Sequence, residues 1–258
     1  MATQIRPPLA RLEMAALDRG LARADAYRVL AVAFRDPDDP SAEGELDLAT
    51  LRSAAAVLGS PIAPEALRTL RRIARRETRA SEHRAIFGHV VAHGCPPYET
   101  EYGRRHVFGQ SQELGDIRGF YEAFGVRPRP GGERPDHVAC ELEFLALLCL
   151  KEAIALTAAD VDRRAICRAA AARFLSDHAG RWLPALAGRI ARRAPSTGYA
   201  AAAAVAATIV TGHARELGAA TDPLEPDDVV PITDEPDGFA FDCGAVAGGD
   251  DLSPPGGS

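Results

Sequence analysis

Apolar residues recur at helical spacing along almost the whole chain, and this pattern constrains the fold more than any other feature. Two stretches carry it most clearly: Tyr27, Leu30, Ala31 and Phe34, and Val138, Leu142, Leu145 and Cys149. Such intervals bring side chains to one face of an α-helix. Convincing strand patterns are missing from the sequence, and alanine, a strong helix former, is abundant. The pattern predicts an all-α fold, a single-domain helical bundle of about eight to ten helices.

Turn and capping residues set the bounds of the expected helices. Besides the two stretches above, we expect helices at 43–58, 64–79, 81–92, 158–179, 181–193 and 196–218, and one through Leu114, Ile117, Tyr121 and Phe124. Pro64 suits the first turn of its helix, and Ser81 is expected to cap the next one. Residues 1–218 then form one all-helical domain, in which residues 1–18 are expected to be flexible.

The C-terminal segment 219–258 differs from the rest of the chain in charge. It carries many Asp and Glu residues and no Lys or Arg, and it contributes strongly to the net charge of −6. Pro, Gly and Asp are frequent in it, with a short apolar patch, "GFAFDCG", at 238–244. Such a segment cannot bury enough apolar area to offset the entropy lost on ordering. We therefore expect an acidic, largely disordered tail.

Composition argues against several classes of protein. The five cysteines form no CxxC pair and no disulfide framework, which fits a reducing cytoplasm. The N-terminus lacks an apolar core of signal-peptide length, and the alanine-rich run at 198–212 is too short to span a bilayer. Basic residues are spread along the helices without an aromatic motif, so nucleic acid is not an expected partner. A cytoplasmic protein without stable membrane insertion is expected.

Two pairs of side chains have a spacing that could hold a metal ion. His137 and Glu141 are four residues apart, as are His89 and His93, so each pair would share a helix face. The HExxH pattern of zinc proteases is missing, because Val90 stands where its Glu should be. The G-x-S-x-G, Walker A and G-x-G-x-x-G patterns are missing too. A helical metal-binding protein or an enzyme using these pairs is one alternative; the leading expectation has no catalysis and no cofactor.

The stretch "ERPDH" at 133–137 directly precedes the long apolar helix. Pro135 suits the first helical position, and Asp136 complements the positive end of the helix. This reading describes a simple helix start, but it leaves His137 unexplained. A histidine beside an acid can also bind a peptide carbonyl or, through the acid, a guanidinium group. Both interpretations remain open on these residues alone.

Four segments, in order, give the chain a family resemblance. They are "EHRAIFG" (82–88), "CPPYETEYG" (95–103), "LGDIRGFYEAFGV" (114–126) followed by "ERPDHVACELEFLALL" (133–148), and "FLSDHAGRWLPALAGRI" (174–190). Together they resemble the TorD/DmsD/NarJ family of cytoplasmic chaperones, which assist the maturation of molybdenum oxidoreductases. The likeness covers about residues 20–215 and leaves out the acidic tail.

The resemblance implies an all-helical protein without catalytic turnover. Members of the family bind the twin-arginine signal peptide or N-terminal region of the catalytic subunit of a molybdopterin oxidoreductase, and hold it back from export until the cofactor is inserted. Carried over by position, the resemblance implies a peptide-binding site at Glu133, Asp136 and His137, with Tyr98, Glu99 and Tyr102 as weaker candidates. Asp136→Ala or His137→Ala should then weaken peptide binding and leave the helical circular dichroism near wild type.

Two further possibilities accompany this expectation. The chain could be a helical structural subunit that remains in the mature complex. The acidic tail could also fold over the peptide site, anchored by Phe239 and Phe241, and compete for the arginines of the partner.

Overall fold

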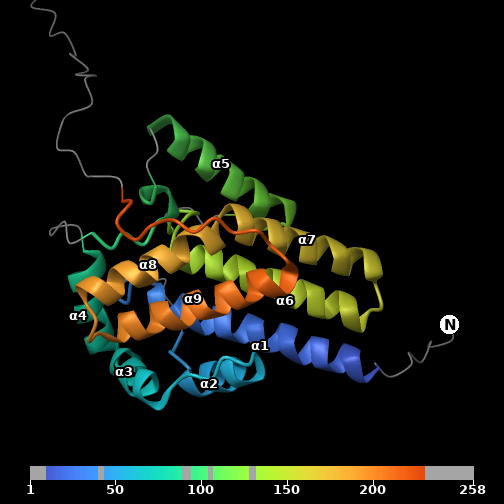
Figure 1. The fold of residues 1–258 in the computed structure, drawn as a ribbon, viewed down its shortest axis with the longest axis horizontal. Helices are drawn as coiled ribbons and strands as arrows, with labels where there is room; N and C mark the ends of the chain where they lie inside the picture. The colour runs from blue at the N-terminus through green and yellow to red at the C-terminus, as the bar shows by residue number, and fades with distance from the viewer. Residues whose placement is uncertain (1–9, 40–43, 89–93, 104–106, 128–131, 230–258) are drawn as a thin grey trace, which may run out of the picture.

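The computed structural model describes residues 10–39, 44–88, 94–103, 107–127 and 132–229. Within these ranges the chain forms nine α-helices, one short 3-10 helix and no strand. In order they are α1 (Arg11–Phe34), α2 (Leu48–Val57), α3 (Pro64–Ala74), α4 (Arg76–Phe87), η1 (Glu99–Glu101), α5 (Val107–Ala123), α6 (Val138–Thr157), α7 (Val161–Asp177), α8 (Ala179–Arg193) and α9 (Gly198–Leu217). The expectation of an all-α bundle is confirmed (Figure 1).

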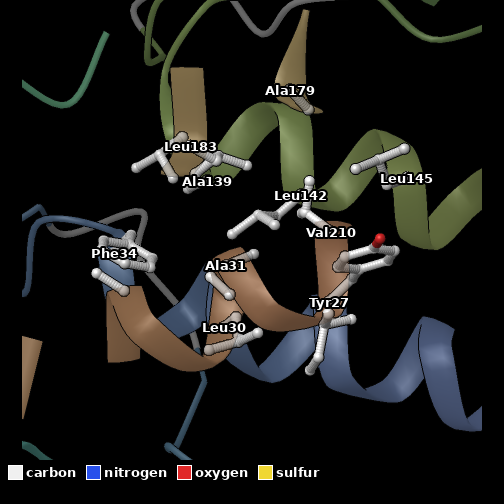
Figure 2. Close-up of a cluster of buried hydrophobic side chains, with 14 of the residues drawn as sticks. Tyr27, Leu30, Ala31, Phe34, Ala139, Leu142, Leu145, Ala179, Leu183 and Val210 are labelled. Carbon is white, nitrogen blue, oxygen red and sulfur yellow. The ribbon is translucent and has the colours of Figure 1, made fainter. Parts of the chain in front are cut away.

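The core lies between α1, α6, α8 and α9. Figure 2 shows Tyr27, Leu30 and Phe34 of α1 on one side of it and Leu142 of α6 opposite, with Val210 of α9 between them. All five side chains are completely buried. Each such side chain contributes about 1.5–3 kcal/mol when it leaves water, so the two stretches with the clearest helical spacing also form the centre of the fold.

The break between α3 and α4 lies at a different position from the one expected. A single helix was expected over 64–79, but Arg75 adopts extended dihedral angles and separates α3 from α4. Ser81 consequently lies inside α4 and does not cap a helix. On either side of the break, both α3 and α4 pack against α9. The expectation for Pro64 is confirmed, since this residue opens α3.

The N-terminal helix is longer than its apolar stripe indicates. α1 begins at Arg11, so residues 11–18, part of the stretch expected to be flexible, are helical. Within the described ranges, no helix has both the length and the apolar character that are needed to cross a membrane.

The segment after α9 also departs from expectation. Gly218 ends α9 in the left-handed conformation, with φ of 67°, and residues 219–229 then run back along α8 (Figure 1). We call residues 219–229 the strap. Its Leu224 amide donates to the carbonyl of Arg181 at 2.9 Å, and Arg189 donates to the carbonyl of Pro226 at 3.0 Å.

The far end of the strap reaches the loop that carries η1. The amide of Gly103 donates to the carbonyl of Asp228, and an antiparallel bridge joins Tyr102 to Val229. The acidic tail was expected to begin at 219, but its first residues pack on the body of the protein, because α8 offers arginines to their carbonyl and carboxylate groups. Phe239, Phe241 and the rest of 230–258 lie outside the described residues.

Candidate functional site

Two segments far apart in the sequence meet where α6 begins. The loop 94–103 pairs with the residues before α6 through an antiparallel bridge between Tyr98 and His137. Two backbone hydrogen bonds of 2.9 Å flank this bridge, one donated from each segment. We call residues 97–101 and 133–138 together the loop–helix junction. It contains most of the predicted site.

Asp136 lies at the centre of the loop–helix junction, and its side chain is fully buried. The carboxylate accepts hydrogen bonds from the amide of Thr100 at 3.2 Å and from its hydroxyl at 2.8 Å. The guanidinium of Arg134 donates to both carboxylate oxygens, at 3.1 and 2.8 Å. A buried carboxylate is costly unless its charge and its hydrogen-bonding capacity are both satisfied. Asp136 is satisfied here, and it fastens the loop to the start of α6.

The outer face of the junction carries partly exposed side chains. The guanidinium carbon of Arg134 lies 4.3 Å from the centre of the Tyr98 ring, a cation–π contact. Arg134 also donates to Glu101 at 3.4 Å. The Tyr98 hydroxyl donates to Glu133 at 3.4 Å, which is long for such a bond. The Glu133 carboxylate and the Tyr98 ring therefore lie at the surface beside the guanidinium of Arg134.

His137 is the N-cap of α6. Its Nδ1 accepts a hydrogen bond from the amide of Ala139 at 3.2 Å, and its ring meets Tyr98 with centroids 5.2 Å apart. Burial lowers the pKa of His137 to about 3, and nearby positive groups add to the effect, so the ring is neutral in the folded protein. The expectation that Pro135 occupies the first helical position is wrong, because the helix begins at Val138, after the cap.

Glu99 faces inward from the junction. Its carboxylate lies 3.1 Å from Nδ1 of His178, between α7 and α8, and the other ring nitrogen lies 3.2 Å from Asp116 of α5. Burial by itself lowers the pKa of His178, but the two carboxylates outweigh that effect, and the net pKa is raised. Glu99 is thus engaged in a buried ion pair that ties the loop to α5 and α8.

Glu141 and Tyr102 meet at Trp182 of α8. Glu141 is fully buried and accepts a hydrogen bond from the Trp182 indole at 2.8 Å. Burial raises the pKa of Glu141 well above its usual range, and the nearby Glu99 carboxylate raises it further. Tyr102 is 2% exposed and packs on the Trp182 ring, with centroids 5.4 Å apart. Both side chains belong to the packing beneath the junction.

The metal alternative gains little from this arrangement. His137 uses Nδ1 for the helix cap, while Glu141 is turned to Trp182. Across the described residues no three His, Cys, Asp or Glu side chains come together in a way that could hold a metal ion. His89 and His93, the second pair, lie outside the described residues.

The structure gathers the predicted site residues around the junction but divides them into two groups. Buried are Glu99, Tyr102, Asp136 and His137; partly exposed are Tyr98 and Glu133. The buried group holds the loop, α6 and α8 together. The exposed group, with Arg134 beside it, is what a ligand would meet first. A role in peptide binding remains a prediction for all of them.

Sequence reasoning missed Arg134, Thr100, His178 and Trp182 as parts of this site. Arg134 and Thr100 lie within the segments 133–148 and 95–103 singled out above, but nothing in the sequence shows that their side chains meet at Asp136. His178 and Trp182 did offer a signal, because they follow Phe174 at intervals of four residues, a spacing typical of apolar helix faces, although a break at His178 divides the segment between α7 and α8. That spacing was noted only as part of the family resemblance, and its link to Glu99 and Glu141 needed the fold.

Comparison with known proteins supplies the wider context. A family model described as "Nitrate reductase delta subunit" matches residues 43–188, more than half of the chain. The matched range contains the loop–helix junction as well as His178 and Trp182.

Two curated proteins show significant similarity. The chain is 35% identical over 115 residues to the selenate reductase assembly chaperone protein of Thauera selenatis, covering 44% of the chain and 58% of that protein. It is 37% identical over 145 residues to the chlorate reductase assembly chaperone protein of Ideonella dechloratans, covering 55% of the chain and 72% of that protein. The match thus spans less than two thirds of the selenate reductase chaperone.

Proposed function

The chain belongs to the nitrate reductase delta subunit family, the family of the TorD/DmsD/NarJ chaperones, and from this premise we propose that it is an assembly chaperone. Its client would be the catalytic subunit of a molybdopterin oxidoreductase in the cytoplasm. The observation that carries the proposal is the similarity to two proteins that are themselves named reductase assembly chaperones. The proposed role is binding without turnover, followed by release when the client is complete.

The segment bound is, in this proposal, the twin-arginine signal peptide or N-terminal region of the client. The outer face of the loop–helix junction supports it, because carboxylates and aromatic rings are the groups that bind guanidinium. Glu133 is the best placed carboxylate. Burial raises its pKa, and the negative charges of Asp36 and Asp39 raise it further despite the bond from Tyr98. Negative charges beside Glu133 attract a cationic peptide.

An apolar groove further along α6 suits the apolar run of a signal peptide. The groove, of about 390 Å³, lies between the end of α5, the second half of α6 and the start of α7. Two isoleucines of its lining are exposed to a degree unusual for this residue type, Ile154 at 66% and Ile166 at 59%. Lys151, Asp160 and Arg163 are the charged residues of its lining.

The distance between the two surfaces fits one continuous peptide. From Val138 to Ile154 the axis of α6 rises by about 24 Å at 1.5 Å per residue. An extended chain covers this distance in about seven residues. A peptide whose arginines contact Glu133 can therefore bring the following apolar residues to Ile154.

The proposal is tested in the native host by removing the gene for this chain. The partner reductase should then accumulate without its molybdenum cofactor, as measured by metal analysis of the purified enzyme, and a plasmid copy of the gene should restore it. Normal metal content in the deletion strain contradicts the proposal. Mass spectrometry of the mature enzyme decides the alternative of a structural subunit, since a chaperone should be missing from it.

A further inference from the structure

Arg134 occupies a site with every feature of a guanidinium receptor. Its Nε and Nη2 atoms bind the two oxygens of Asp136 in the fork geometry that planar guanidinium prefers. Nη2 also donates to the Thr100 hydroxyl at 2.7 Å, and Nη1 reaches Glu101 at 3.4 Å. The ring of Tyr98 covers one face of the group at 4.3 Å.

The receptor and its occupant differ sharply in exposure. The Asp136 side chain is fully buried, whereas the Arg134 side chain is 43% exposed. Arg134 enters from the solvent side, on the irregular segment before the helix cap, and does not belong to a helix or to the hydrophobic core. It can therefore swing out into water without disturbing an element of secondary structure, whereas Asp136 and Thr100 are held in the buried part of the junction.

The carboxylate has no room for a second arginine. Oδ2 already accepts from the Thr100 amide, the Thr100 hydroxyl and Arg134, and Oδ1 accepts from Arg134 as well. A foreign guanidinium cannot be added to this arrangement; it can only replace the one that is present.

We propose that Asp136, Thr100 and Tyr98 form a guanidinium receptor that the chain's own Arg134 fills, and that an arginine of the client binds there by displacing Arg134. This inference rests on the proposed function for the identity of the incoming arginine. It gives Arg134 the role of an internal competitor: the vacant receptor would leave a buried carboxylate unpaired, so Arg134 closes it whenever no client is bound. Client affinity is thereby set below the full strength of the receptor, which favours release.

The receptor itself is tested without a client, by thermal unfolding of the full-length chain. Arg134→Ala should lower the melting temperature, and millimolar methylguanidinium should raise it again in a saturable way, whereas methylammonium should not. Wild type and the control Arg118→Ala, which removes an exposed arginine of α5, should show no such stabilisation. If methylguanidinium and methylammonium act alike on Arg134→Ala, the receptor does not exist and the proposal is overturned.

Displacement is tested by calorimetry with a synthetic peptide that contains an Arg-Arg pair and an apolar run. Arg134→Ala should bind this peptide about tenfold more tightly than wild type, a difference of about 1.4 kcal/mol. Should Arg134→Ala not fold, Arg134→Lys replaces it, because lysine keeps the charge but lacks the planar fork; it too should bind the peptide more tightly than wild type. Equal affinity of wild type and variant would overturn the displacement and leave the proposed function intact. Absence of binding to any of the chains would count against the proposed client and overturn the displacement, whereas the methylguanidinium experiment still decides the receptor.

Discussion

Substitution of Asp136 by alanine should destabilise the protein, although the sequence alone suggested a change confined to binding. The carboxylate is fully buried and accepts hydrogen bonds from Thr100 and Arg134. Its removal takes away the side-chain hydrogen bonds between η1 and the start of α6 and leaves only the backbone bonds of the loop–helix junction. The sequence led us to expect a helical circular dichroism signal near wild type; the burial of Asp136 adds a loss of stability to that expectation.

The size of the effect follows from the groups left behind. The buried amide of Thr100 loses its acceptor, which costs about 1–3 kcal/mol. The Thr100 hydroxyl loses the acceptor of its hydrogen as well, but it can rotate to find another. Arg134 is 43% exposed and can turn to water, so the full cost of about 3–5 kcal/mol for breaking a buried ion pair does not apply. We expect a total loss of about 2–4 kcal/mol in the free energy of unfolding.

Urea unfolding followed by far-ultraviolet circular dichroism measures this loss. The matched control is Glu133→Ala, which removes a partly exposed carboxylate of the same junction, whose hydrogen bond from Tyr98 is long at 3.4 Å. A change of this kind at the surface should stay within about 0.5 kcal/mol. If Asp136→Ala unfolds at the same urea concentration as Glu133→Ala, Asp136 does not fasten the junction and the structural reasoning fails.

Three more changes test other parts of the account. His137→Asn keeps a capping side chain but removes a group that stays neutral in the folded state down to a pKa of about 3. The unfolded chain takes up that proton near pH 6.5. As the pH decreases below this value, the free energy of unfolding of wild type therefore decreases by about 1.4 kcal/mol per pH unit. Between about pH 6.5 and 5 wild type should lose about 2 kcal/mol more than the variant in urea titrations; parallel curves would contradict the burial of a neutral imidazole. Glu133→Gln should weaken binding of an Arg-Arg peptide about tenfold in calorimetry, whereas Glu122→Gln, an exposed acid on α5, should not; equal affinities would remove Glu133 from the site. Gly198→Ala places a Cβ atom 2.5 Å from buried Ile73, so it should cost about 1–3 kcal/mol through overpacking, and an unchanged melting temperature would refute that contact.

Helical spacing was sufficient to predict the architecture, because the stripes of α1 and α6 are regular and form the core. It could not reveal the break at Arg75, since one residue with extended dihedrals hardly changes the spacing of the stripes on either side. The order of the strap could not be predicted for a different reason. Its composition is that of a disordered segment, and its order depends on the arginines of α8, which are distant in sequence.

The residues of the candidate site could be named from the sequence, but the direction in which their side chains point could not. The motif at 133–137 is visible because a proline, an acid and a histidine stand together before a long apolar helix. Whether its carboxylate points inward depends on the loop around Tyr98, which arrives from more than thirty residues upstream. Only the fold shows that Asp136 is already paired within the chain. We therefore propose that a client first contacts Glu133 of this motif and the neighbouring Tyr98, the two partly exposed residues of the candidate site.

Site-specific photo-crosslinking to the catalytic subunit proposed as the client tests the central claim most directly. A photoreactive phenylalanine analogue at Tyr98, on the outer face of the junction, should cross-link to the N-terminal segment of that subunit, with the linked residues close to its arginine pair. The same analogue at Leu12, which is 85% exposed at the start of α1, should give no such product. Cross-links from Tyr98 that map to other parts of the subunit, or equal yields from both positions, would contradict binding of the client's N-terminus at the loop–helix junction.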